Sequence, residues 1–75
     1  MHRYYFDIRV ADDVAEDDEG ADLPDLEAVQ KEALRALADM ARDLMEFPTS
    51  MAVEVRDDAG AVMDARVVFK IHRTN

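Results

Sequence analysis

Few residues in this 75-residue chain have side chains suited to catalysis or metal binding, and the two histidines come first. His2 and His72 are the only imidazoles, and they would approach each other if the first and last predicted strands were paired. Two imidazoles supply half of a transition-metal site. The chain has no cysteine, so it offers no thiolate ligand, no thiol nucleophile and no disulfide. We therefore expect surface or structural roles for both histidines and predict no metal site.

The densest cluster of charge is an acidic run that ends just before Gly20. Its carboxylates belong to Asp12, Asp13, Glu16, Asp17, Asp18 and Glu19. Calcium prefers several carboxylate oxygens, but the EF-hand register fails here. With Gly20 in the invariant glycine place, Ala15 would hold the first ligand position and Leu26 the bidentate one. We interpret the run as a solvated acidic loop, with weak adventitious cation binding as the alternative.

Acid–base catalysis would need paired titratable groups held in a pocket. The candidates are Asp7 beside Arg9, and Asp64 near Arg66. A domain of this size leaves little room for a cleft of the usual ~300 Å³ or more. The sequence also contains no G-x-S-x-G, Walker or H-E-x-x-H motif. We therefore predict that the protein is not an enzyme, and expect no catalytic residue and no cofactor.

The longest element that could position these side chains is a helix from Asp25 to about Glu46. At about 100° per residue, one arc of its helical wheel is apolar and the opposite arc is charged. The apolar arc contains Leu26, Val29, Ala33, Leu37, Met40 and Leu44, widened by Leu34, Ala41 and Met45. Asp25 is the predicted N-cap, and Pro48 stops the helix near Glu46. The pattern predicts one long amphipathic helix with one buried face.

Alternating apolar and polar residues predict strands on both sides of the helix. A long first strand covers residues 2–10, and a short second strand covers 14 to about 16. After the helix, a third strand covers 51–56 and a fourth covers 61 to about 71. The turn between them, residues 57–60, ends in glycine, as expected for a hairpin.

The element order is ββαββ, which predicts a single α+β domain over residues 1–75. We expect a two-layer structure, in which an antiparallel sheet carries the helix on one face. The favoured strand order across the sheet is 14–16, 2–10, 51–56, 61–71. The order 2–10, 14–16, 61–71, 51–56 fits the same geometry, and a parallel contact between the first and last strands is a third option. A chain this short buries only about 60% of its unfolded surface, so self-association would stabilise it.

The charge balance of the chain is strongly acidic, with a formal net charge of −9. This charge repels nucleic-acid phosphate and anionic membranes. The opening MHRYYFDIRV carries charged residues throughout, and no apolar run reaches the ~18 residues that a membrane span needs. We therefore expect a cytoplasmic protein with no membrane contact.

The sheet face turned away from the helix carries most of the nine basic residues. The candidate interface predicted there is basic and partly aromatic, and consists of Arg3, Tyr5, Arg9, Arg56, Arg66, Val68 and Lys70. Tyrosine and arginine are enriched at binding hot spots, although an antiparallel sheet commonly leaves one face in water. Exposed strand edges offer a second route to pairing.

These surfaces lead us to predict a non-enzymatic accessory module that binds a protein partner, or a second copy of itself as a homodimer. The alternative is nucleic-acid binding, with Tyr5 stacking on a base and the basic residues contacting phosphate. The net charge of −9, and a single aromatic residue on that face, argue against it. A third interpretation, that the acidic loop and helix imitate nucleic acid, depends on charge alone.

Four segments together carry a resemblance to a known family: YYFDIR, DDEG, LPDLEAV and VEVRDDAG. In this combination the chain resembles a family of small bacterial domains of unknown function over nearly its whole length. The resemblance implies a ββαββ domain from a bacterium. It implies no activity, cofactor or catalytic residue.

Overall fold

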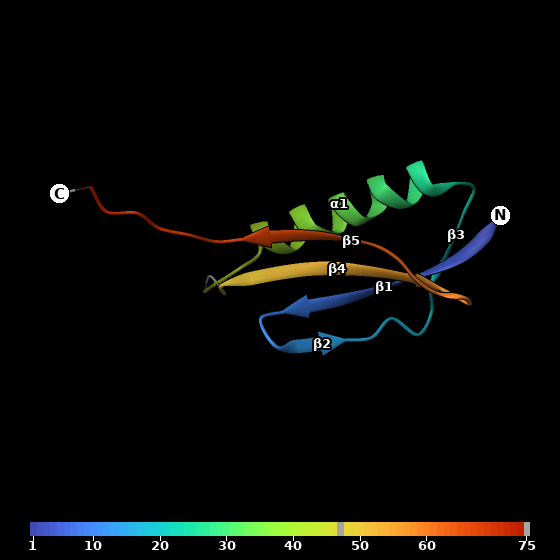
Figure 1. Cartoon of the computed structure of the whole chain (residues 1–75), viewed down its shortest axis with the longest axis horizontal. Coiled ribbons are helices and arrows are strands. Elements are labelled where there is room, and N and C mark those ends of the chain that lie inside the picture. The colour runs from blue at the N-terminus through green and yellow to red at the C-terminus, as the bar shows by residue number, and fades with distance from the viewer. Residues whose placement is uncertain (47, 75) are drawn as a thin grey trace.

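The computed structural model describes residues 1–46 and 48–74, which form one helix and five strands. In chain order these are β1 (His2–Val10), β2 (Asp13–Ala15), β3 (Ala21–Leu23), α1 (Leu26–Arg42), β4 (Ser50–Asp57) and β5 (Gly60–Val68). All strand pairs are antiparallel, and α1 covers one face of the sheet (Figure 1). The predicted two-layer α+β fold is confirmed.

The strand order is β2-β1-β4-β5, which confirms the favoured prediction for the four strands that the sequence indicated. The strand β3 was not predicted. β2 pairs with the C-terminal end of β1, where Ile8 lies opposite Ala15, and β3 pairs with its N-terminal end, where Tyr4 lies opposite Ala21. The chain therefore runs back along the length of β1 before it enters the helix.

The helix α1 begins as predicted but ends four residues before Glu46. Asp25 caps its N-terminus, because its carboxylate accepts a hydrogen bond of 2.8 Å from the Ala28 N–H. Asp43 closes the last turn by donating its N–H to the Met40 carbonyl, 3.2 Å away. Aspartate at this end opposes the helix dipole and favours caps over helix interiors, so the helix stops well before Pro48.

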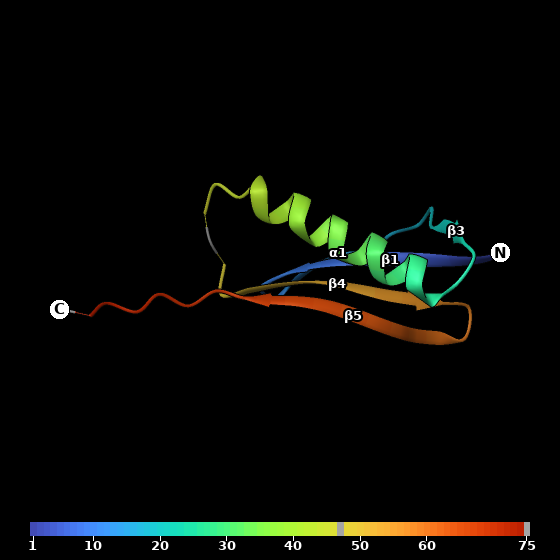
Figure 2. The same cartoon turned by 90° about the horizontal axis from the view of Figure 1, so that it is seen from above.

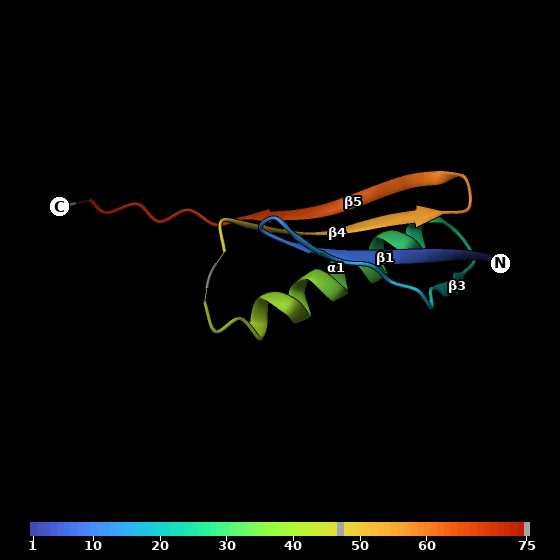
Figure 3. The same ribbon diagram turned by 90° about the horizontal axis from the view of Figure 1, so that it is seen from below.

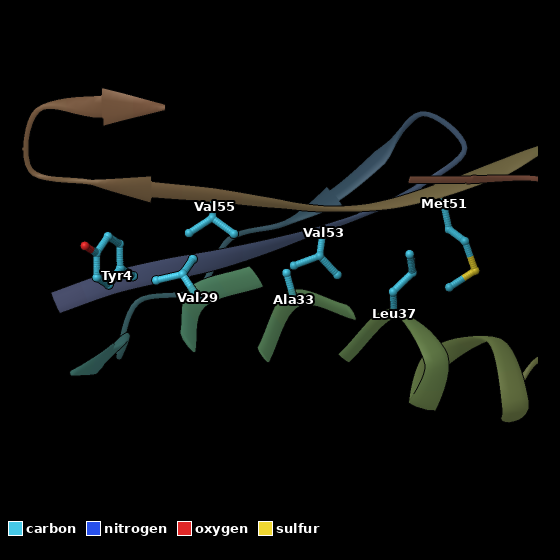
Figure 4. Packing of buried hydrophobic residues seen from close by; sticks show 7 residues of the cluster. All are labelled: Tyr4, Val29, Ala33, Leu37, Met51, Val53 and Val55. Atoms are coloured by element: carbon cyan, nitrogen blue, oxygen red, sulfur yellow. The ribbon is translucent and has the colours of Figure 1, made fainter. Parts of the chain in front are cut away.

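The core lies between α1 and the middle of the sheet, where two rows of side chains meet (Figure 4). Its buried members are Tyr4, Val29, Ala33, Leu37, Met51, Val53 and Val55. Three residues predicted on the buried arc are exposed instead: Leu26 by 56%, Leu34 by 51% and Met45 by 97%. Leu26 is the first helical residue and Met45 follows the helix, while Leu34 lies to one side of the narrow stripe that meets β4.

The hairpin of β4 and β5 reverses at Gly60, whose φ of +124° favours glycine. A register shift lies between Val55 and Arg56, and β5 ends at Val68, before the predicted Ile71. Phe69 still packs against the core, and residues 70–74 continue as a tail that runs away from the body of the domain (Figure 1). Among the described residues, no helix is long and apolar enough to cross a membrane.

Candidate interaction surface

The face of the sheet opposite α1 has no helix over it in the part of the chain that the structure describes, and we call it the open face (Figure 2). Strand register arranges its side chains in rows across β1, β4 and β5. The rows are Tyr5, Arg56 and Ala61; then Asp7, Glu54 and Asp64; then Arg9, Ala52 and Arg66. An acidic row thus lies between two rows that carry arginine.

The three arginines of these rows are all paired with carboxylates. Arg9 Nε lies 3.0 Å from Glu54 Oε2, and Arg66 Nη2 lies 3.3 Å from Asp64 Oδ2 and 4.0 Å from Glu54 Oε2. Arg9 donates to the Glu54 carboxylate, which raises the pKa of its guanidinium. The open face is therefore balanced in charge, and the expectation of a basic surface was wrong, because register places a carboxylate beside each of these guanidinium groups.

Arg56 contacts three other residues at the open face. Its Nε donates to Asp7 Oδ2 at 2.9 Å, and its Nη2 donates to the Asp17 carbonyl at 2.9 Å. Its guanidinium carbon also lies 4.6 Å from the centre of the Tyr5 ring, a cation–π contact. The hydrogen bond to Asp7 raises the pKa of Arg56. One side chain of β4 thereby joins β1 to the segment between β2 and β3.

Asp17 corrects the interpretation of the acidic run as a wholly solvated loop. Its Oδ2 accepts the Phe6 N–H at 3.0 Å, and its Oδ1 accepts the N–H groups of Glu19 and Gly20 at 3.0 and 3.1 Å. Its own N–H donates to Asp7 Oδ1 at 2.9 Å. The bond from Phe6 leads the causes that lower the pKa of Asp17, followed by those from Gly20 and Glu19, against the opposing effect of burial.

The position of Asp17 explains why β2 and β3 are separate strands. The side chain takes the place of a backbone carbonyl opposite Phe6, in the gap between the two strands that pair with β1. Gly20 completes the turn with a φ of +74°, and a Cβ there would lie 3.0 Å from the Tyr4 carbonyl. An aspartate three residues before a glycine is the signal of an Asx turn that could have revealed this site from the sequence.

The predicted interface residues do not all share one surface. Tyr5, Arg9, Arg56 and Arg66 lie together on the open face, where Val68 ends β5 with 59% of its side chain exposed. Arg3 lies at the end near β3, where it pairs with Asp22 at 3.1 Å and donates to the Glu19 carbonyl. Lys70 lies beyond the end of β5, in the exposed tail.

A shallow hollow of about 570 Å³ opens on the sheet beside the β4–β5 hairpin. Asp7, Glu54, Arg56, Val62, Asp64 and Arg66 contribute to its lining. The expectation that the domain is too small for a hollow above ~300 Å³ was therefore wrong. Its carboxylates accept bonds from arginines. The hollow therefore presents neutralised ion pairs to a ligand.

The two histidines are not brought together, because β1 and β5 are separated by β4. The His2 ring lies edge-on to Tyr4, 6.5 Å between centroids, and His72 is in the tail after β5. In residues 1–46 and 48–74 no group of three or more histidine, aspartate or glutamate side chains is arranged to hold a metal ion. In the acidic run, the Asp17 carboxylate accepts hydrogen bonds from backbone N–H groups.

Comparison with known proteins finds a family model described as a domain of unknown function, DUF6894, which matches residues 3–71. No curated protein and no solved structure matches the chain. The match covers every helix and strand except the first residue of β1.

Proposed function

Because the chain belongs to the DUF6894 family, a family of domains of unknown function, we propose a function from its own surface: it is a non-enzymatic module that binds a protein through the open face. The observation that carries this proposal is the order of that face. Arg56 is held by Asp7, by the Asp17 carbonyl and by the Tyr5 ring, so a hot-spot pair of tyrosine and arginine is already fixed.

Fixed side chains favour binding because a partner does not have to order them. Immobilising a long side chain at an interface costs about 0.5–1.5 kcal/mol, and here the ion pairs restrict Arg9, Arg56 and Arg66 in the free protein. The hollow beside the hairpin adds a concave place for one apolar or charged side chain of the partner. Alternating acidic and basic rows select a partner with the opposite alternation.

The same geometry disfavours nucleic-acid binding. The guanidinium of Arg56 lies over the Tyr5 ring, on a surface where a base would stack. Asp7 and Glu54 also lie between the arginines, where they would repel phosphate. We expect no change in fluorescence anisotropy when the protein is added to single-stranded RNA or DNA at low ionic strength. A salt-dependent increase would favour the nucleic-acid alternative.

Affinity capture with paired variants tests the protein-binding proposal. The test variant combines Tyr5→Ala with Arg9→Glu, which removes the ring and reverses one charge of the open face. The control is Arg35→Glu, which makes the same charge reversal on the exposed back of α1, where Arg35 is 73% exposed. Circular dichroism first establishes that all three proteins are folded.

A partner that is retained by the wild type and the control, and is lost from the test variant, supports the proposal. The retained protein should also bind the purified domain directly in isothermal titration calorimetry. Recovery of the same proteins from all three baits would contradict it, since the open face would then make no difference to binding.

A further inference from the structure

The open-face proposal uses side chains of β5 but not the backbone groups along the outer edge of this strand. Within the described residues β5 pairs only with β4, and the chain beyond Phe69 runs away from the sheet (Figure 3). Phe69 donates its N–H to the Thr49 carbonyl at 3.0 Å. In an antiparallel ladder, peptide groups point alternately to the two sides, so those of Asp64, Arg66 and Val68 point away from β4.

This edge has few of the features that prevent strands from pairing. Residues 62–68 contain no proline and no lysine, which commonly protect exposed edges. Their two charges are opposite in sign and two positions apart, at Asp64 and Arg66, and both lie on the open face. The residue between them is Ala65, which is small enough to allow close approach of another strand.

We infer that two copies of this chain pair through β5, antiparallel about a two-fold axis at Ala65, with Asp64 of each copy opposite the partner's Arg66. Both residues point their peptide groups to the free edge, so each pair would exchange backbone hydrogen bonds. In the same register Val62 lies opposite the partner's Val68. Met63 lies opposite the partner's Val67 on the helix side.

The alternation of faces selects this register. If the two-fold axis passed between two residues, side chains of the open face would lie opposite helix-side side chains of the partner. A centre at Asp64 or at Arg66 would place two like charges directly opposite each other, which destabilises a strand pair. Only the centre at Ala65 combines opposite charges with a paired segment, 62–68, that lies entirely within β5.

A groove between α1 and β5 supports a second copy as the occupant. It has a volume of about 360 Å³, and Ala33, Leu34, Met63 and Ala65 contribute to its lining. Because Ala65 would lie at the axis, the grooves of the two copies would adjoin there. The two Leu34 side chains, each 51% exposed in one copy, would then pack together above the small alanines.

The accessible surface of the single chain is larger than that of a compact monomer, as expected for a subunit that buries part of its surface against a second copy. Its accessible surface is 5804 Å², against about 4,700 Å² expected for a compact monomer of this mass. Its radius of gyration is 13.8 Å, against about 11 Å for a compact domain of this length. The extended tail contributes to both differences.

Charge reversal provides a test in which the variants rescue each other. Asp64→Arg gives a chain with two positive charges at the axis, and Arg66→Asp gives one with two negative charges. We expect a wild-type dimer in sedimentation velocity, and a dissociation constant raised about tenfold or more in either variant. An equimolar mixture of the two should form a heterodimer in native mass spectrometry, because both cross-strand pairs are then complementary. The double variant should again form a homodimer.

The groove has its own matched pair of variants. Leu34→Gln should weaken the dimer, whereas Leu26→Gln, which changes a similarly exposed leucine of the same helix outside the groove, should not. Thermal unfolding followed by circular dichroism separates lost pairing from lost folding. A wild-type protein that stays monomeric at about 1 mM, a dimer unaffected by both charge reversals, or a mixture that forms no heterodimer would each overturn the inference. The test variants of the open-face proposal, at Tyr5 and Arg9, leave β5 unchanged, so failure of the dimer and failure of the open-face proposal can be told apart.

Discussion

Asp7 and Arg56 are 49 residues apart in the chain, and their side chains meet at 2.9 Å between Arg56 Nε and Asp7 Oδ2. The Asp7 carboxylate also accepts the N–H of Asp17, while Arg56 donates to the Asp17 carbonyl. These contacts hold β1, β4 and the segment between β2 and β3 together on the open face. They carry the first prediction.

The contributions of Asp7 and Arg56 to the free energy of unfolding should depend on each other. Asp7→Asn and Arg56→Gln each remove one charged partner of the ion pair and leave the other charge unpaired. Each should therefore lower the free energy of unfolding. The double variant should lose less than the two single losses combined. Urea unfolding of the four proteins measures this. Strict additivity would show that the pair contributes no interaction energy.

Asp17→Ala should destabilise the protein by about 1–3 kcal/mol, because it leaves the N–H groups of Phe6, Glu19 and Gly20 without their acceptor. Asp18→Ala is the matched control, since Asp18 is an exposed neighbour in the same acidic run. It should change stability by less than about 0.5 kcal/mol. Equal losses in chemical unfolding would mean that the Asp17 carboxylate has no special role.

The lowered pKa of Asp17 predicts how its contribution depends on pH. Its ordinary value is 3.8, and the folded protein holds the pKa below this. The unfolded state therefore binds the proton more readily, and the stabilisation is fully present above the unfolded pKa. It is lost as the pH falls through the folded pKa. The stability difference between the wild type and Asp17→Asn should shrink as the pH is lowered below about 4. A difference that stays constant from pH 6 to the acid limit would contradict this prediction.

Val53 tests where the core lies. It is 0% exposed in the centre of β4, so Val53→Ala should cost about 1–3 kcal/mol through lost burial and the cavity that remains. Val14→Ala makes the same change on β2, where the side chain is 43% exposed, and should cost less than about 0.5 kcal/mol. The two thermal unfolding midpoints can be compared directly. A larger loss at Val14 would place the core elsewhere.

The sequence predicted the main elements because β1, α1, β4 and β5 each have a clear hydrophobic period. It did not indicate β3, since Ala21–Leu23 follows directly on the acidic run that ends at Gly20 and pairs with β1 through its backbone. The helix α1 ends early because Asp43 is its C-cap. The sequence prediction instead placed the end by Pro48, which lies further along the chain. A helical wheel identified an apolar arc but could not say how wide a stripe the sheet covers, so Leu34 was assigned to the core although half of it is exposed.

The interface residues were harder to predict than the fold. Their place on the open face follows from period-2 alternation, which the register of β1, β4 and β5 confirms for Tyr5, Arg9, Arg56 and Arg66. Their partners depend on which residues of different strands lie side by side. Arg9 meets Glu54 across 45 positions of sequence, a contact that no local pattern encodes. The structural role of Asp17 was not predicted, because it lies in a run of acidic residues that were all interpreted as solvated.

The pairing of β1 with β4 has a consequence for how the protein is made. Translation proceeds at about 5–20 residues per second, so β4 follows β1 by about 2–10 s. A hairpin forms within about 10 μs, so β1 can pair with β2 and β3 long before β4 emerges. Before α1 and β4 have emerged, Tyr4 and Phe6 have no helix or central strand to cover them. The acidic run beside them, folded back by Asp17, would give the nascent chain a negative charge that opposes aggregation at the ribosome.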